Sequence, residues 1–312
     1  MFEIRRYAAD NAAEWNAFVE RSKQGTFLFN RGYMDYHRDR FSDNSLMVYH
    51  RQRLFALLPG NRCGDTFYSH QGLTYGGFVT DEKATAGRLC EIAGAVSEAL
   101  RADGVRRIVY KPVPWVYHRL PAEDDLYALS IRCHARLIGR DASSVVFLRQ
   151  RLRFAESRMS GVRKALRQGF EVKGSDDLEA FWNILTDNLH RKYGAKPVHT
   201  VAEMRMLKDR FPKEIRLFMI YRDAVPLGGT VLYLTPQVVR TQYISATPEG
   251  KQTGALDLLF HHLLNETDFQ RPYFDFGTSA QGDTDELNAS LIFQKEGFGG
   301  RTVCFDRYEW EV

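Results

Sequence analysis

The order of predicted helices and strands in the first half of the chain recurs in the second half. Each half runs as helix, helical segment, hairpin, strand, turn, helix, strand, helix and strand. Residues 67–113 match 241–278 in the order and length of these elements, with little residue identity. A chain of 312 residues also exceeds the usual size of one domain. We therefore predict an internal duplication that divides the chain into two domains, 1–151 and 152–312.

Hydrophobic periodicity and turn residues define the individual elements. In the first half they predict a helix over 11–22, a strand leading into a helix over 26–41, a hairpin over 45–60, a strand over 66–79, a helix over 82–102, a strand over 107–112, a helix over 125–134 and a strand over 143–149. In the second half they predict helices over 152–168, 175–194 and 200–211, a hairpin over 216–234, a strand over 238–246 with a helix after it, a strand over 272–277, a helix over 283–295 and a strand over 301–310. Asp176 with Glu179, and Thr200 with Glu203, are predicted capping boxes.

Composition and charge indicate an ordinary folded protein. The hydrophobic fraction of 44%, with 13% aromatic residues, is enough for packed cores and excludes a disordered chain. The net charge of +4 suits an anionic small ligand and is too weak to indicate nucleic acid. No apolar run approaches the roughly 20 residues of a membrane span, and the first residues do not resemble a signal peptide. We therefore expect a cytoplasmic protein without a membrane span.

The cysteines and histidines are not spaced as metal ligands. The four cysteines contain no C-x-x-C pair and are scattered along the chain, at Cys63, Cys90, Cys133 and Cys304. Buried free thiols are the expected state, because a disulfide framework belongs to small secreted chains. No metal is predicted.

One turn has the composition of a phosphate site. The turn over 247–256 contains Pro248, Gly250 and Gly254 between a strand and an apolar helix, and Lys251 lies beside the glycines. Glycines let backbone N–H groups approach an anion, and a helix N-terminus presents N–H groups without internal partners. The turn matches neither G-x-x-x-x-G-K-[ST] nor G-x-G-x-x-G. The alternative is a tight connection between two core elements.

The second half resembles the GNAT acyltransferase fold, in which a hairpin and a strand precede such a turn and a helix, strand, helix and strand follow it. In that fold the turn binds the pyrophosphate of acyl-CoA. The resemblance implies that the donor-binding residues here are Gly250, Lys251, Gln252, Thr253, Gly254 and Ala255. The family pattern Gln/Arg-x-x-Gly-x-Gly/Ala is matched in part: Gln252 and Gly254 are offset, and one glycine is missing.

A second resemblance covers most of the chain and is clearest from about residue 162 onward. "YFDFGTS" followed by "LIFQKEGFGG" is similar to the paired motif of the Fem-type aminoacyl transferases and their acetyltransferase-like relatives. That family consists of two GNAT domains in tandem, in agreement with the duplication. The resemblance implies an α/β (α+β) protein with mixed sheets flanked by helices. Residues 152–312 would hold the donor, and a degenerate first domain, 1–151, would shape an acceptor groove.

The candidate catalytic residues follow from the needs of acyl transfer to an amine. The donor must be positioned, the oxyanion stabilised and a proton removed. By resemblance, Lys295 is the lysine of the family's F-K-x-x-F-G motif and stabilises the oxyanion; the alternative is a solvated lysine near a helix C-terminus. Asp275 would orient the amine or take its proton, unless it caps the next segment. Tyr243 and Ser245 would act through water from the strand before the turn. A backbone N–H of "PLGGTVLY", with a bulge at its glycines, is the expected oxyanion contact.

Two further sets of residues are candidates for substrate binding. Family members carry an aromatic-plus-lysine motif in the first domain, and His37 and Arg38 lie near the lysine position here. The segment from Arg149 to Arg167 carries seven basic residues against one acid, and Arg163 and Arg167 are its candidates for contact with phosphate. The alternative is a solvated linker helix.

The sequence therefore predicts an N-acyltransferase with acetyl-CoA or another acyl-CoA as donor and no metal. The expected acceptor is an amine, such as an amino sugar or a cell-envelope precursor, in the groove between the domains. One alternative is a Fem-type transferase that uses aminoacyl-tRNA to extend a peptidoglycan precursor, although tRNA would require a wider basic surface. The other is a non-catalytic GNAT-like binding protein. The oligomeric state stays open.

Overall fold

The computed structural model describes residues 2–281, 284 and 286–312. The chain forms two compact units, Met1–Ala142 with Cys304–Val312, and Ser143–Val303. This division differs from one boundary between residues 151 and 152, because two long strands each have residues in both units: β8 (Arg136–Phe147) and β14 (Arg301–Glu311). The functions assigned to domains 1–151 and 152–312 stay predictions.

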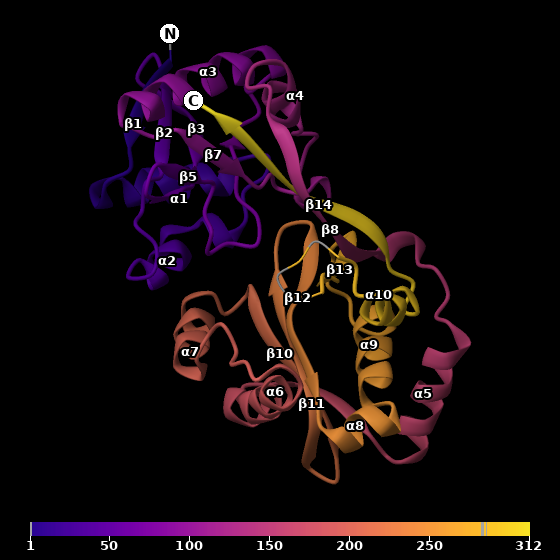
Figure 1. Cartoon of the computed structure of the whole chain (residues 1–312). Coiled ribbons are helices and arrows are strands. Elements are labelled where there is room, and N and C mark those ends of the chain that lie inside the picture. The colour runs from indigo at the N-terminus through magenta and orange to yellow at the C-terminus, as the bar shows by residue number, and fades with distance from the viewer. Residues whose placement is uncertain (1, 282–283, 285) are drawn as a thin grey trace. The chain divides into compact units, whose positions relative to one another are not determined.

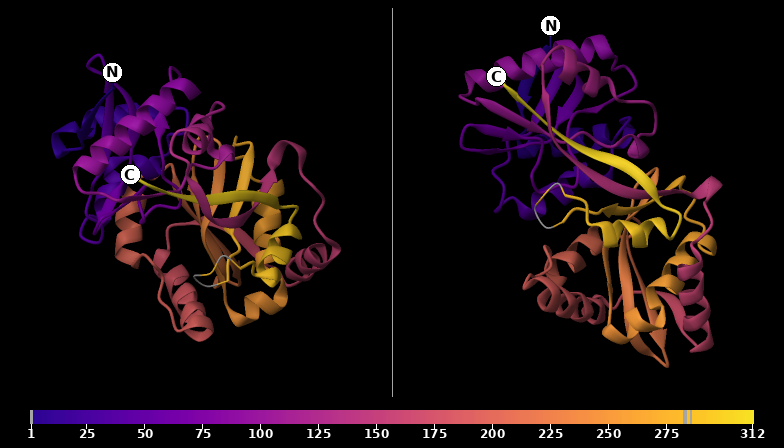
Figure 2. Two further views of the ribbon diagram at one scale, coloured as in Figure 1. Left: turned by 45° about the horizontal axis from the view of Figure 1, so that its top comes forward. Right: turned by 45° about the vertical axis from the view of Figure 1, so that its right-hand side comes forward.

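In the first unit, which contains short strands, α3 (Ala86–Ala102) packs against α4 (Asp124–Ile131) (Figure 1). Its strands are β1 (Phe2–Arg6), β2 (Leu46–His50), β3 (Arg53–Leu58), β4 (Asn61–Cys63), β5 (Thr66–Tyr68), β6 (Val79–Thr80) and β7 (Arg107–Tyr110), and its helices are α1 (Ala12–Arg21), α2 (Arg31–Met34), α3 (Ala86–Ala102) and α4 (Asp124–Ile131). One sheet has the order β1-β2-β3-β6. A second run of paired strands, β4-β5-β7-β14-β8, ends on the two long strands, which lie side by side in Figure 2.

The second unit is built around the strand order β8-β13-β12-β11-β10-β9. Its strands are β9 (Glu171–Ser175), β10 (Ile215–Arg222), β11 (Val225–Leu234), β12 (Val238–Ala246) and β13 (Tyr273–Thr278), and its helices are α5 (Glu156–Arg167), α6 (Leu178–Tyr193), α7 (Val201–Arg210), α8 (Pro248–Thr253), α9 (Ala255–Asn265) and α10 (Ala289–Glu296). β12 and β13 are parallel, whereas β9 to β12 are antiparallel neighbours. The predicted α/β class, with mixed sheets flanked by helices, is confirmed.

The helices of the second unit cover both faces of its sheet. α6 and α7 lie on one face, and α5 and α9 lie on the other (Figure 1). α9 is apolar along one side because its sequence repeats leucine and phenylalanine at helical spacing, and the buried residues are Ala255, Leu258, Leu259, Phe260, Leu263 and Leu264. The last four of these residues pack against β13 and β11 through Phe274, Phe276 and Leu232. This core fixes α9 and the turn before it relative to β12 and β13.

Several local predictions are wrong. Residues 26–41 form η2 (Phe27–Phe29), α2 and η3 (Asp35–His37) in place of a strand followed by a helix. The helix cap at the start of α6 is Asp177, whose Oδ1 accepts the Ala180 N–H, because Asp176 pairs with Lys208 instead. The capping box of Thr200 and Glu203 is confirmed.

Two predictions concern other features. All four cysteines are free, as expected, but Cys63 and Cys304 are exposed and Cys90 and Cys133 are partly exposed, so they are not the buried thiols that were predicted. The helix predicted over 283–295 begins at Ala289, and residue 283 lies outside the described residues.

Candidate acyl-transfer site

β12 and β13 pair over only three residues and then separate. The parallel pairs are Val238 with Tyr273, Val239 with Phe274 and Arg240 with Asp275. Beyond them β12 continues to Ala246 along β11. A gap therefore opens between the second half of β12 and the end of β13.

The strands that separate are β12 and β13, whereas the prediction had placed the first strand of the separated pair at β11. β11, which contains "PLGGTVLY", stays paired with β12 up to Gly228 opposite Ala246. Gly228 and Gly229 are in register with β12, and the irregularities lie beside Leu227 in β11 and at Gln242 in β12. The glycines are needed for packing: a Cβ at Gly228 would lie 2.8 Å from Ser245 O. The predicted bulge at the two glycines is therefore wrong.

A cavity of about 530 Å³ lies where the two strands separate. Its lining comes from β12, β13 and five helices of the second unit: Arg158, Lys192, Ile244, Lys251, Gly254, Leu256, Asp257, Phe260, Phe276, Leu291, Gln294, Lys295 and Phe298. The aromatic residues of this lining are buried, whereas Lys192, Lys251 and Gln294 are exposed. The cavity therefore runs from exposed polar side chains to a buried aromatic wall. Three residues predicted from the sequence, Lys251, Gly254 and Lys295, meet in it.

Lys295 is a buried cation on the cavity wall. It is 6% exposed, and its Nζ donates to Gly277 O at 2.8 Å, Thr278 O at 2.7 Å and Ser279 Oγ at 3.0 Å. These three acceptors match the three N–H donors of an ammonium. Burial lowers the pKa of Lys295 to about 8 against the attraction of Asp275. The side chain therefore fixes the end of β13 and places a titratable charge at the cavity, so it is not a solvated lysine.

The predicted phosphate turn is a short helix, α8, followed directly by α9. Thr247 is the N-cap, its Oγ1 accepts the Gly250 N–H at 3.0 Å, and Pro248 occupies the first helical position. The signal was present in "TPE", since a threonine N-cap, a proline and an acid in the first turn are typical of a helix start. Gly254 ends α8 with a φ of +83° and begins α9.

Packing accounts for both glycines of this turn. A Cβ at Gly250 would lie 2.4 Å from Leu227 O, and one at Gly254 would lie 2.3 Å from Gly161 O in α5. The other predicted donor residues differ in burial. Gln252 is exposed and its backbone oxygen accepts Lys164 Nζ, Thr253 donates to Glu249 O, and Ala255 is part of the core.

Tyr243 and Ser245 point to the opposite side of β12 from Ile244, because side chains alternate along a strand. Tyr243 Oη contacts His199 Nδ1, and Ser245 Oγ accepts Asn188 Nδ2 at 2.6 Å. Burial raises the pKa of Tyr243 to about 12, so its hydroxyl is a hydrogen-bond donor at neutral pH. These two residues therefore lie on the face covered by α6 and α7, away from the cavity that holds Lys295.

Asn188 and His199 were not predicted from the sequence. Asn188 connects two predicted residues: its Nδ2 also donates to Ala246 O, and its Oδ1 accepts Lys251 Nζ. His199 is buried, and its backbone oxygen accepts Trp182 Nε1 at 3.1 Å. Neither residue belongs to a local motif, so only the packing of α6 on β12 reveals them.

Asp275 is completely buried in an ion pair. Its Oδ2 accepts Arg240 Nη1 at 2.8 Å, and its Oδ1 accepts the hydroxyl of Ser143 and the N–H of Gly277. It is absent from the cavity lining. The carboxylate therefore fixes the last paired position of β12 and β13 and the turn after it.

The two residues of the first unit that were predicted to bind substrate, His37 and Arg38, differ in solvent exposure. His37 is buried and stacks on Tyr36 with ring centroids 4.3 Å apart, and the ring of His70 lies 5.3 Å away. Burial lowers the pKa of His37. Arg38 is exposed. His37 and Arg38 are adjacent in the sequence, but only Arg38 is exposed to solvent.

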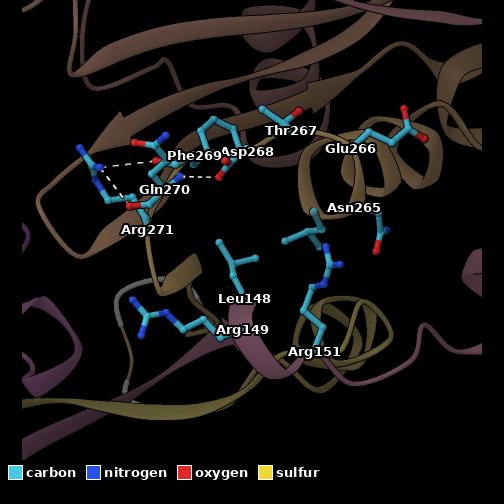
Figure 3. A pocket seen from close by; sticks show the side chains of 11 residues that line it. Leu148, Arg149, Arg151, Asn265, Glu266, Thr267, Asp268, Phe269, Gln270 and Arg271 are labelled. Atoms are coloured by element: carbon cyan, nitrogen blue, oxygen red, sulfur yellow. Dashed lines mark hydrogen bonds between the residues drawn. The ribbon is translucent and has the colours of Figure 1, made fainter.

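The basic segment from Arg149 to Arg167 is divided between two places. Arg163 and Arg167 are exposed on α5, where Arg163 pairs with Glu156. Arg149 and Arg151 line a second cavity, of about 470 Å³, between the end of β8 and the C-terminus of α9 (Figure 3). Arg271 in that cavity donates to the oxygens of Thr235, Phe269 and Gln270, so its charge supports the loop.

Among the residues that the structure describes, no group of three His, Cys, Asp or Glu side chains could hold a metal ion. Over the same residues, every helix is too short or too polar to cross a lipid bilayer.

Comparisons with known proteins agree with this geometry. Residues 148–285 match the family model described as an acetyltransferase (GNAT) domain. FemX has a TM-score of 0.69 at 13% identity, covering 99% of this chain and 97% of that one. A tandem GNAT protein from the clavulanic acid biosynthesis pathway has a TM-score of 0.53 at 12% identity, covering 100% and 98%. L-PGS from Bacillus licheniformis has a TM-score of 0.59 at 11% identity, covering 97% and 91%. No curated protein matches.

Residues 148–285 therefore form a domain of the GNAT acetyltransferase family. The chain as a whole has the fold of the tandem GNAT proteins, and FemX shares that fold. The resemblance predicted from the sequence is confirmed.

Proposed function

We propose that this chain is an N-acyltransferase that transfers the acyl group of acetyl-CoA or another acyl-CoA to an amine. The thioester lies in the cavity between β12 and β13. One observation carries the proposal: where the two strands separate, a single cavity contains both Lys295 and two residues of the predicted donor turn, Lys251 and Gly254. The buried aromatic wall suits the apolar part of a thioester donor.

The reaction joins an unprotonated amine to the thioester carbonyl carbon. A C–N bond forms while the carbonyl oxygen becomes an oxyanion, and the C–S bond then breaks. CoA leaves as a thiolate, and the proton lost by the amine nitrogen neutralises it. The positive charge of Lys295 on the cavity wall stabilises the oxyanion electrostatically. In this reaction Asp275 takes no proton and instead positions the end of β13, because its carboxylate is bonded to Arg240, Ser143 and Gly277.

We propose that the first unit binds the amine acceptor and does not bind an acyl donor. By the predicted duplication, the segment 66–79, which runs from β5 to the start of β6, corresponds to β12, and β7 corresponds to β13. Tyr110 of β7 connects them: its Oη accepts the N–H of Phe78 at 2.7 Å and donates to Asp125 at 2.6 Å. All three residues are buried. In the first unit a buried tyrosine thus connects these two segments, whereas a cavity lies between β12 and β13 in the second unit. The proposed acceptor is an amino sugar or a cell-envelope precursor, in the cytoplasm.

A transfer assay tests the proposal. Purified protein is incubated with acetyl-CoA and a panel of amino sugars, and acetylated products and released thiol are measured. We expect transfer to at least one amine, lost at least 100-fold in Lys295→Met and retained in Lys213→Met, an exposed lysine away from the cavity. Transfer from aminoacyl-tRNA alone would instead support the Fem-type alternative. Binding of an amine without transfer from either donor would support a GNAT-like binding protein.

A further inference from the structure

The helix terminus expected to bind the donor pyrophosphate already carries an anion. Asp257 is the third residue of α9, and its carboxylate accepts Arg158 Nη1 at 2.8 Å. The side chain of Asp257 is 13% exposed, and burial raises its pKa. A carboxylate in the first turn neutralises the positive end of the helix dipole. A phosphate at this terminus would therefore have to compete with the Asp257 carboxylate for Arg158 and for the helix N-terminus.

Two backbone N–H groups of the turn already have acceptors within the turn. The N–H of Gly250 donates to Thr247 Oγ1, and the N–H of Lys251 donates to Thr247 O, both at 3.0 Å. α5 packs directly on the start of α9, because a Cβ at Gly161 would lie 1.8 Å from Asp257 Oδ2. Gly254 faces Gly161 O in the same contact. The glycines that suggested a phosphate site thus serve the packing of α5 on α8 and α9.

Two lysine side chains lie on the same cavity. Lys192 is in the last turn of α6, and Lys251 is in α8. Both are exposed. The hydrogen bond from Lys251 Nζ to Asn188 Oδ1 fixes the ammonium, and Asn188 is fixed by Ser245 and Ala246 of β12. α6 and α8 therefore place two cations at the exposed end of a cavity whose buried end contains Lys295 and Phe276.

We propose that the phosphate groups of the donor bind the side chains of Lys192 and Lys251, in place of the backbone N–H groups of the 247–256 turn. This inference rests on the proposed function and specifies how its donor is held. Ammonium–phosphate contacts are charge-assisted hydrogen bonds, stronger than neutral ones. Binding through the lysines also leaves the Asp257–Arg158 ion pair and the packing of α5 on the turn in place. Binding of pyrophosphate to the backbone of the turn would have to displace both.

The test compares CoA with pantetheine, which has the same thiol arm without the nucleotide phosphates. Binding of each to the full chain is measured by isothermal titration calorimetry for the wild type, Lys192→Glu, Lys251→Glu and Lys213→Glu. Lys213→Glu is the matched control, because it makes the same charge change in the same unit away from the cavity lining. Thermal unfolding of each variant verifies that it is folded.

We expect each cavity variant to weaken CoA binding about tenfold or more, because it replaces a charge-assisted hydrogen bond to phosphate with a repulsive carboxylate. Pantetheine binding should change less than twofold, and Lys213→Glu should bind both ligands as the wild type does. CoA binding that is unchanged in both cavity variants would overturn this inference and leave the proposed function standing. Wild-type protein that binds neither CoA nor pantetheine would overturn both.

Discussion

At the scale of single residues, two charged side chains meet the end of β13, and they have different roles: Asp275 belongs to β13 and Lys295 to α10. Lys295 lines the cavity, whereas Asp275 is enclosed by Arg240, Ser143 and Gly277. The sequence motif contains both and cannot separate them, because burial and partners are properties of the fold. The prediction for Asp275 therefore concerns stability, and the prediction for Lys295 concerns activity.

Asp275→Asn should lower the free energy of unfolding by about 3–5 kcal/mol, because it removes a fully buried carboxylate that pairs with the largely buried guanidinium of Arg240. Chemical denaturation followed by tryptophan fluorescence measures this change. Asp223→Asn, at an exposed turn, is the control. In a double-mutant cycle with Arg240→Leu, the two losses should be strongly non-additive. Additive losses would mean that the pair contributes nothing to stability.

Lys295 should give the reaction an alkaline limit. Its pKa is lowered by burial to about 8, and the proposed role requires the charged ammonium. With an amine acceptor already unprotonated at the working pH, kcat should fall as pH rises through about 8. In Lys295→Arg, the remaining activity should continue to higher pH, since a guanidinium stays charged. An alkaline limb at the same pH in both proteins would exclude Lys295 as its source.

At the scale of elements, Gly254 lies in the contact between α5 and the start of α9. Gly254→Ala should destabilise the protein by roughly 2–4 kcal/mol, because Gly254 has a φ of +83° and a Cβ there would meet Gly161 O. Gly174→Ala is the matched control, because no heavy atom lies within 4 Å of its Cβ position. Equal stability of the two variants, measured by denaturant unfolding, would contradict this packing.

Most long elements could be predicted from the sequence, and most short ones could not. The helix of α9 and the hairpin of β10 and β11 are strongly periodic and buried, so local pattern and tertiary fold agree. β1 and β9, which were not predicted, are the end strands of their sheets. β9 is "EVKGS", with one apolar residue, so only its pairing with β10 makes it a strand.

The site itself was predictable only in part. Lys251, Gly254 and Lys295 were identified through a family pattern and do meet in one cavity. The separation of β12 from β13 depends on where pairing stops after Asp275, which no local sequence signal reports. Asn188 and Lys192 of α6 were not predicted, because only the tertiary fold brings α6 close to α8 and β12.

At the scale of the whole molecule, the last strand belongs to a unit whose other residues come some 160 positions earlier. Residues 304–312 are part of the first unit. There β14 pairs with β7, and Trp310 is buried in the core with Tyr110. The duplication predicted two domains, but long-range pairing of this kind has no sequence period and could not be predicted.

A variant that ends at Val303 should therefore lose the first unit, although it lacks only nine residues of it. We expect limited proteolysis to degrade residues 1–142 while residues 143–303 resist, because the core of the second unit does not use β14 after Val303. Proteolysis of the intact chain is the control. Protection of residues 1–142 in the shortened variant would show that their core is complete without Trp310.

The central claim is that the donor thioester lies where β12 and β13 separate. The most direct measurement is a crystal structure of the chain with acetyl-CoA. We predict the pantetheine arm between Ile244 and Phe276, the carbonyl on the side of Lys295 and the phosphates beside Lys192 and Lys251. Acetyl-CoA bound in the second cavity near Arg149 and Arg271, or away from the β12–β13 gap altogether, would contradict the account.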